Sequence, residues 1–124
     1  CVYSCPELAC TGLTEEAAQR VGKAYDVGVF PLAANGRALI MNGGNGVIKV
    51  LVGKTHREIL GVHIYGPRAT DLISEACLAV GMEATSDEVL ATIHGHPTLG
   101  EALREAVLAA EGRAVHLPPA KERL

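Results

Sequence analysis

The fold is decided by Val47-Ile48-Lys49-Val50-Leu51-Val52 and by Ile59-Leu60-Gly61-Val62-His63-Ile64-Tyr65. Both stretches are rich in β-branched residues, and both alternate over the length of an ordinary strand. The segment between them, residues 53–58, is polar and short enough to be a hairpin loop. We therefore expect a β-hairpin here, which makes the middle of the chain antiparallel sheet.

Outward from the hairpin, the same signals predict more strands and several helices. Strands are expected at residues 2–4 and 7–11 around Pro6, at 25–32 with Val27 and Val29 on one face, and at 38–41. Residues 33–37 are expected to be a link, and residues 42–46 (Asn-Gly-Gly-Asn-Gly) a turn. Helices are expected from the N-cap Thr14 to Gly22, over 69–81, from the capping box Thr85-x-x-Glu88, and over 99–110.

The order of these elements favours an α+β fold. Strands cluster early and helices late, which predicts an antiparallel β-sheet flanked by helices that lie on one face. With 124 residues the chain has the length of one domain. We assign residues 1–112 to that domain and residues 113–124 to a loosely held C-terminal tail.

Composition excludes several classes of function. Apolar residues make up 48% and charged residues 20%, as in globular proteins. A net charge of −3, with three Tyr, one Phe and no Trp, disfavours binding to nucleic acid. No apolar run approaches the length of about 18 residues that a membrane span needs. Residue 1 is Cys and no signal segment precedes it, so the chain looks like part of a longer, cytoplasmic protein.

The four cysteines do not predict a disulfide framework or a zinc site. Cys1 and Cys5 would lie ~13 Å apart on an extended strand, which is beyond disulfide reach. The spacing of Cys1, Cys5 and Cys10 is not that of zinc ligands. Cys77 falls on the apolar stripe of the helix expected at 69–81, where a free thiol acts as a small hydrophobe. Reduced thiols are therefore expected.

The stretch Ile93-His94-Gly95-His96-Pro97-Thr98-Leu99-Gly100-Glu101 carries the candidate chemistry. Pro97 keeps His96 out of helical conformation, so a helix should begin at about Thr98. Glu101 then lies in its first turn, from which its carboxylate can reach the His96 imidazole. One ring nitrogen would bind Glu101 while the other faces a substrate, as in a base held by an orienting carboxylate.

Other interpretations of these residues stay open. Thr98-x-x-Glu101 is itself a capping box, which needs no histidine. The pair His94-x-His96 could bind zinc with Cys1, Cys5 and Cys10, although no spacing supports it and we expect no metal site. His56 is expected in solvent and His63 on a strand face. The segment 42–46 lacks the Gly-Lys-Ser/Thr ending of a phosphate loop.

The sequence resembles a known family, on the following residues. The motif His94-Gly95-His96-Pro97-Thr98-Leu99-Gly100-Glu101-Ala102 is similar to the C-terminal motif of dihydrolipoamide dehydrogenases, which are pyridine nucleotide–disulfide oxidoreductases. Supporting blocks are Val2-Tyr3, Pro6-Glu7, Gly12-Leu13-Thr14-Glu15, Phe30-Pro31-Leu32-Ala33-Ala34-Asn35-Gly36-Arg37-Ala38, Ile59-Leu60-Gly61-Val62-His63-Ile64-Tyr65-Gly66-Pro67 and Leu72-Ile73-Ser74-Glu75-Ala76. Together they extend from Val2 to about Gly112. Gly100 departs from the pattern, because relatives often have serine there.

The resemblance implies a dimerisation (interface) domain that forms a homodimer. In that family the His-Pro loop, whose His96–Pro97 bond would be cis, enters the partner's active site. By position, His96 would take a proton from a dihydrolipoyl thiol and Glu101 would hold and polarise it. The parent enzyme would use FAD and NAD and would serve the dihydrolipoyl acyltransferase of a 2-oxo acid dehydrogenase complex.

The chain lacks the Gly-x-Gly-x-x-Gly and redox-cysteine motifs of such an enzyme. Cys1 and Cys5 should not be mistaken for the redox pair. This chain alone is therefore expected to bind no flavin and to be inactive. Two alternatives remain: the interface domain of a glutathione reductase-like enzyme, and a stand-alone dimerisation module without catalytic duty.

Overall fold

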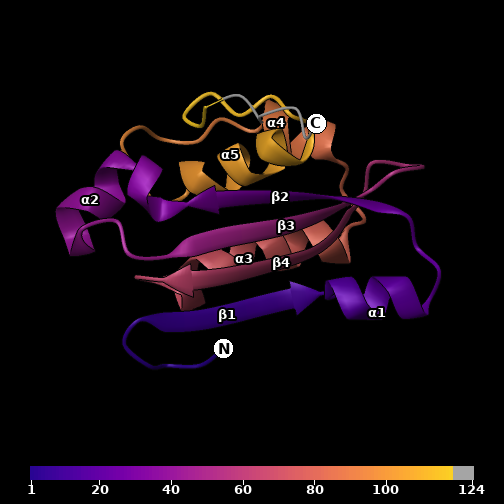
Figure 1. The fold of residues 1–124 in the computed structure, drawn as a ribbon, viewed down its shortest axis with the longest axis horizontal. Coiled ribbons are helices and arrows are strands. Elements are labelled where there is room, and N and C mark those ends of the chain that lie inside the picture. Colours follow the sequence, from indigo (N-terminus) through magenta and orange to yellow (C-terminus); the bar gives the residue numbers. More distant parts are fainter. Residues whose placement is uncertain (119–124) are drawn as a thin grey trace.

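A four-stranded antiparallel sheet forms the centre of the molecule (Figure 1). The structure is a computed structural model and describes residues 1–118. Its strands are β1 (Glu7–Gly12), β2 (Tyr25–Pro31), β3 (Val47–Gly53) and β4 (Ile59–Gly66), in the order β1-β4-β3-β2. The hairpin of β3 and β4 pairs Val50 with Val62 and confirms the prediction. Residues 2–4, expected as a strand, contribute an isolated bridge from Val2 to Leu8.

One face of the sheet carries the main core under two helices. Helix α3 (Ala69–Gly81) lies over β1 and β4, whereas α5 (Glu101–Ala110) lies over β2 and β3 and also contacts α4 (Ser86–Ala91). The α5 backbone packs directly on Gly28, where any Cβ atom would overlap the carbonyl oxygen of Ala106. The largest core side chains that the sheet buries beneath these helices are Phe30, Ile48, Val50, Val52, Val62 and Ile64.

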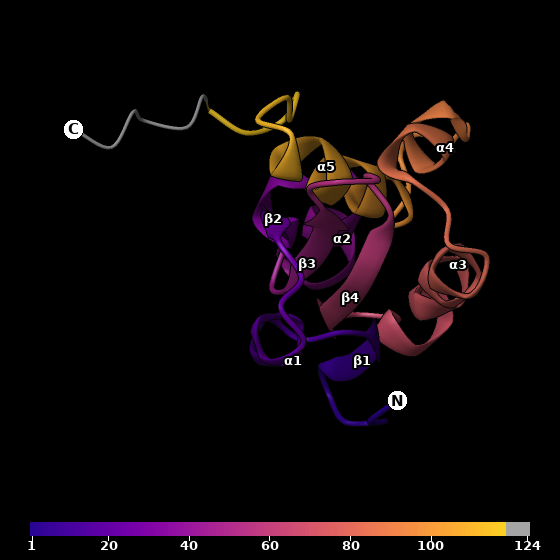
Figure 2. The ribbon, with the colours of Figure 1, turned by 90° about the vertical axis from the view of Figure 1, so that its right-hand side faces the viewer.

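The opposite face of the sheet is covered in part by α1 (Glu15–Arg20). There Ala18 packs with Leu51 and Leu60 in a second, smaller cluster. Figure 2 shows α1 and α3 on opposite sides of the sheet. The predicted α+β class is confirmed, but the expectation that all helices share one face is wrong for α1.

The strand predicted at residues 38–41 is wrong, because these residues lie in helix α2 (Gly36–Asn42). Asn35 caps this helix by accepting a hydrogen bond from the Ala38 backbone N–H. Gly43 ends it in the left-handed conformation at φ 72°. Both signals are local and outweigh the apolar content that suggested a strand. The expected link before α2 contains a short 3₁₀ helix, η1 (Leu32–Ala34).

Two further expectations need correction. Cys77 lies on the exposed side of α3, because the buried side is formed by Ala69, Ile73 and Ala76. Helix α5 begins at Glu101 and not near Thr98, since residues before it make single-turn hydrogen bonds such as Ala102 N–H to the Leu99 carbonyl. All four cysteines are exposed and unpaired.

The predicted tail is described as far as Pro118, and residues 119–124 lie outside the described part of the chain. Within it, the backbone N–H groups of Val115 and His116 each donate to Glu105, a buried carboxylate on α5, at 3.0 Å. Among residues 1–118, none of the helices combines the length and apolar character needed to cross a membrane.

Candidate acid–base site

The loop between α4 and α5 carries the candidate site. It starts at Thr92, whose backbone N–H closes α4, and it ends where the buried side chain of Leu99 enters the core. Within it, the Thr98 hydroxyl donates to the Gly95 carbonyl at 2.6 Å. The His96–Pro97 peptide bond is cis, as the sequence resemblance implied. The loop is thus held at both ends while its middle faces outward.

His96 and Glu101 meet at the start of α5. His96 Nδ1 lies 2.9 Å from Glu101 Oε2. The His96 side chain is 74% exposed, whereas the Glu101 side chain is 17% exposed. The structure therefore brings together the two side chains that the motif singled out, with the carboxylate recessed and the ring presented to solvent.

This geometry decides what the ring can do. A carboxylate can only accept a hydrogen bond, so the His96 Nδ1–H donates to Glu101. In the neutral ring the free lone pair is then on Nε2, and the side chain that carries it is largely exposed. Such a ring can accept a proton at Nε2, and the nearby carboxylate then stabilises the imidazolium that forms.

The capping-box interpretation of Glu101 describes only half of what is present. The Glu101 backbone N–H approaches the Thr98 hydroxyl at 3.4 Å, as in a capping box. The carboxylate of Glu101, however, is directed at His96 and at the Asn35 amide. The Glu101 side chain thus binds the histidine, whereas the Glu101 backbone N–H makes the contact typical of a helix N-cap.

His94, two residues earlier in the loop, has a different environment. Its side chain is 8% exposed, and Nε2 lies 2.6 Å from Oε1 of Glu75 on α3. Its Nδ1 lies 3.1 Å from the Thr92 carbonyl oxygen. Both ring nitrogens of His94 are thus engaged, while His96 turns to Glu101, so the two rings do not converge as zinc ligands would. Among residues 1–118, no group of three or more His, Cys, Asp or Glu side chains is placed to hold a metal ion.

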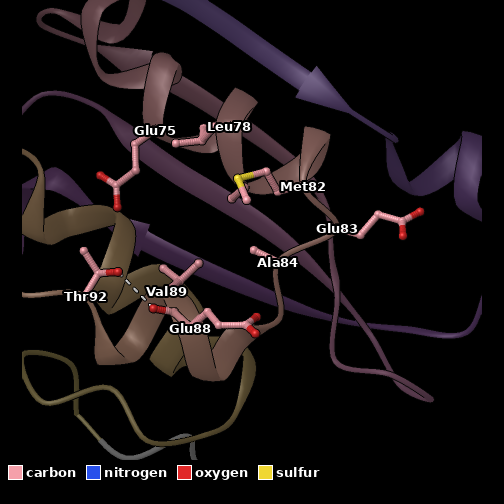
Figure 3. A pocket seen from close by; sticks show the side chains of 9 residues that line it. Glu75, Leu78, Met82, Glu83, Ala84, Glu88, Val89 and Thr92 are labelled. Atoms are coloured by element: carbon pink, nitrogen blue, oxygen red, sulfur yellow. Dashed lines mark hydrogen bonds between the residues drawn. The ribbon is translucent and has the colours of Figure 1, made fainter.

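A groove runs between α3 and α4, next to this loop (Figure 3). Leu78 of α3 and Met82, the C-cap residue of that helix, are 63% and 72% exposed and line it together with Val89 of α4. Glu75, the partner of His94, lies at its edge. An apolar groove of this kind beside a candidate catalytic loop is typical of a surface that another polypeptide covers.

The family is shown by a match to its sequence pattern. Residues 1–107 match the dimerisation domain of the pyridine nucleotide-disulphide oxidoreductases. The chain belongs to this family. The dimerisation domain described above, with its antiparallel sheet and outward loop, is the architecture that the sequence resemblance implied.

Curated relatives agree with this assignment. The dihydrolipoyl dehydrogenase of Bacillus subtilis is 49% identical over 116 residues, which are 94% of this chain and 24% of that protein. The dihydrolipoyl dehydrogenase of Thermus scotoductus is 47% identical over 116 residues, again 94% of this chain and 25% of that protein. The dimerisation domain thus spans about a quarter of the length of these relatives.

Solved structures show the same fold. LpdA from Mycobacterium tuberculosis matches with a TM-score of 0.80 and 25% identity, covering 85% of this chain and 23% of that one. The HOCl-induced flavoprotein disulfide reductase RclA from Escherichia coli matches with a TM-score of 0.78 and 27% identity, covering 83% and 24%. The dimerisation domain is therefore similar in fold to one part of larger proteins.

The sequence-based interpretation missed the roles of three side chains that hold the pair or its loop. Asn35, expected in a link, contacts Glu101 and the Thr98 carbonyl oxygen. His94 was weighed only as a metal ligand, and Glu75 only as part of a family motif. The N-cap pattern of an Asn followed by Arg37-Ala38-Leu39 and a terminal Gly43 could have identified the helix after Asn35, but not its contact with Glu101.

Proposed function

We propose that this dimerisation domain supplies the acid–base pair His96 and Glu101 to an NAD-linked dihydrolipoamide dehydrogenase. The observation that carries the proposal is the 2.9 Å contact between an exposed imidazole and a recessed carboxylate. The names of the relatives favour the lipoamide branch over a glutathione reductase-like enzyme. In this proposal the activity belongs to a larger protein, and the isolated chain is inactive.

In the proposed reaction, His96 acts as the base. Its Nε2 takes the proton of a dihydrolipoyl thiol, so the S–H bond breaks, an N–H bond forms, and a thiolate remains. Glu101 keeps Nδ1–H bonded throughout, which fixes the ring orientation and stabilises the positive charge on the ring. The pair can return the proton when the reaction runs in the opposite direction.

FAD and NAD, which the family uses, do not fit the residues of this chain. The glycine-rich segment 42–46 ends helix α2 and leads into β3, so no helix N-terminus follows it to receive a phosphate. Gly43 there is the left-handed helix cap. In the proposal both cofactors are therefore bound outside this chain.

The proposed working state is a homodimer. The family description names dimerisation, and the groove between α3 and α4 offers an apolar surface for a second copy. Ile93, at the start of the catalytic loop, is 96% exposed and would be covered in the same contact. This arrangement would carry His96 into the partner copy's active site.

Other partners follow from the same proposal. The reduced substrate would be the lipoyl group of a dihydrolipoyl acyltransferase in a 2-oxo acid dehydrogenase complex. The cytoplasmic location expected for this protein stays a prediction, because its relatives include mitochondrial enzymes of Arabidopsis thaliana as well as bacterial ones.

A chimera tests the proposal directly. This chain replaces the matching segment of the Bacillus subtilis enzyme, and turnover of dihydrolipoamide is measured with FAD absorbance as the measure of assembly. We expect His96→Gln to lower kcat by about a hundredfold or more with FAD retained, because a general base is lost. His56→Gln, which changes an exposed histidine of the β3–β4 loop, is the matched control. Normal turnover in His96→Gln would refute the assigned role and favour a dimerisation module without catalytic duty.

A further inference from the structure

Asn35 is one of three buried polar residues in the part of the chain that the structure describes, and it is 3% exposed. It lies between η1 and α2, far along the sequence from the catalytic loop. A buried amide needs partners for both its oxygen and its nitrogen, because an unpaired polar group away from water is costly. Its partners therefore show what it holds in place.

The two ends of the Asn35 amide bind different parts of the molecule. The oxygen Oδ1 accepts from the Ala38 backbone N–H at 2.9 Å and so caps α2. The nitrogen Nδ2 donates to the Thr98 carbonyl oxygen at 2.9 Å, across 63 positions of sequence. Since the Ala38 N–H requires an oxygen opposite it, the amide orientation is fixed and the NH₂ group must face the loop.

The same NH₂ group also faces the candidate site. Nδ2 lies 3.5 Å from Oε1 of Glu101, the oxygen that His96 does not use. Oε2 of the same carboxylate lies 2.9 Å from His96 Nδ1. The carboxylate is thus held between a neutral donor on its inner oxygen and the imidazole on its outer oxygen.

We infer that Asn35 is a positioning residue for the His96–Glu101 pair. It ties the loop to α2 through the Thr98 carbonyl and holds the Glu101 carboxylate in the rotation that meets the ring. Without the NH₂ group, the Thr98 carbonyl loses its buried donor and the carboxylate can turn away from His96. The inference rests on the proposed function of His96 as a base, and it adds a residue through which that base is oriented.

Two variants separate this role from helix capping. Asn35→Asp keeps an oxygen for the Ala38 N–H and the same size, but places an acceptor opposite the Thr98 carbonyl and Glu101. Asn35→Ser keeps a good N-cap without adding charge, and it is too short to reach Glu101. Asn42→Asp is the matched control, because Asn42 ends the helix that Asn35 caps and its amide binds only locally: it donates to the Asn45 carbonyl at 2.8 Å and accepts from the Gly44 N–H at 3.2 Å.

The first measurement is the tautomer of His96, from ring ¹⁵N shifts in this chain. We expect the neutral ring to carry its proton mainly on Nδ1 in the parent and in Asn42→Asp. In both Asn35 variants the population should move toward the Nε2–H form, because the carboxylate no longer holds Nδ1–H. A purely capping role would leave the tautomer unchanged in both variants, and that result would overturn the inference.

The second measurement is turnover in the chimera. We expect both Asn35 variants to lower kcat roughly tenfold to a hundredfold with KM little changed, because a misplaced base costs rate and not binding. If the Asn35→Asp chain fails to fold, Asn35→Ser carries the test. If His96→Gln leaves turnover intact, the proposed function fails while the tautomer measurement still decides this inference. If His96→Gln inactivates but both Asn35 variants keep the parent tautomer and kcat, only this inference fails.

Discussion

The contact between His94 and Glu75 should contribute a measurable coupling free energy between the loop and α3. Nε2 of His94 lies 2.6 Å from Glu75 Oε1, and Nδ1 lies 3.1 Å from the Thr92 carbonyl oxygen. Both neighbours are acceptors, so the two hydrogen bonds exist together when the ring carries a proton on each nitrogen. The test removes the His94 side chain, the Glu75 side chain, and then both, by substitution with alanine.

The exposure of the two side chains sets the magnitude of their coupling. Breaking a fully buried ion pair costs about 3–5 kcal/mol, whereas exposed pairs contribute about 0.2–1 kcal/mol. His94 is 8% exposed and Glu75 is 39% exposed, so the contact lies between these limits. We expect a coupling free energy of about 1–2 kcal/mol, with a larger loss for His94→Ala than for Glu75→Ala because the histidine also fills space.

A double-mutant cycle in urea measures this coupling. The free energy of unfolding is compared for the parent, His94→Ala, Glu75→Ala and the double variant, with m-values checked for constancy. Glu83→Ala is the matched control, since Glu83 borders the same groove and its removal should add to His94→Ala without coupling. A coupling below about 0.3 kcal/mol would show that the two side chains are neighbours without an energetic tie.

Two further predictions concern assembly and acid stability. Met82→Glu places a charge in the groove between α3 and α4, so it should raise the dimer dissociation constant of the chimera more than about tenfold, as measured by sedimentation. Met41→Glu, which changes an exposed methionine of α2, is the control and should leave the dissociation constant unchanged. Burial alone would raise the pKa of Glu111, but hydrogen bonds from Ser86 and two arginines lower it below the ordinary 4.5. The stability that Glu111 contributes is therefore fully present above its ordinary pKa of 4.5 and is lost as the pH falls through its lower, folded-state pKa. Glu111→Gln removes this contribution, so the free energy of unfolding should fall less steeply with acid in the variant than in the parent.

Elements with strong periodicity could be predicted from the sequence. The β3–β4 hairpin alternates over both strands, and α5 repeats apolar residues at Ala102, Leu103, Ala106 and Val107, all of which are buried. The caps at Thr14 and Thr85 were equally clear, because each has a side-chain oxygen where the first backbone N–H groups need one. In these segments the local signal and the tertiary packing agree.

Helix α2 could not be predicted from apolar content, and the reason is physical. Leu39 and Ile40 are 51% and 74% exposed, so the apolar run there does not mark a buried strand. The deciding signals were the cap at Asn35 and the left-handed Gly43. The opposite placement of α1 was also missed, since periodicity shows that a helix buries one side but not against which face of a sheet.

In the candidate site, too, local contacts could be predicted from the sequence and long-range contacts could not. A histidine before proline, with a glutamate five positions after it, predicted that His96 and Glu101 could meet, because the geometry of a helix start is local. Asn35 and Glu75 contact the loop from 63 and 19 positions away, and only the folded chain brings them there. Sequence reasoning on one chain therefore finds the candidate acid–base side chains more readily than the side chains that hold them.

The difference in exposure across the pair indicates why the proposed chemistry would need a second surface. Glu101, at 17% exposed, is oriented by this chain, whereas His96, at 74% exposed, still faces water. A base in water loses selectivity, because solvent competes for its proton and screens its carboxylate. In the proposed function, the chain sets the tautomer and the orientation, and another polypeptide would exclude the water. Burial of the His96 edge on assembly, visible as slowed exchange of its ring protons, is thus the step that would turn a held imidazole into a working base.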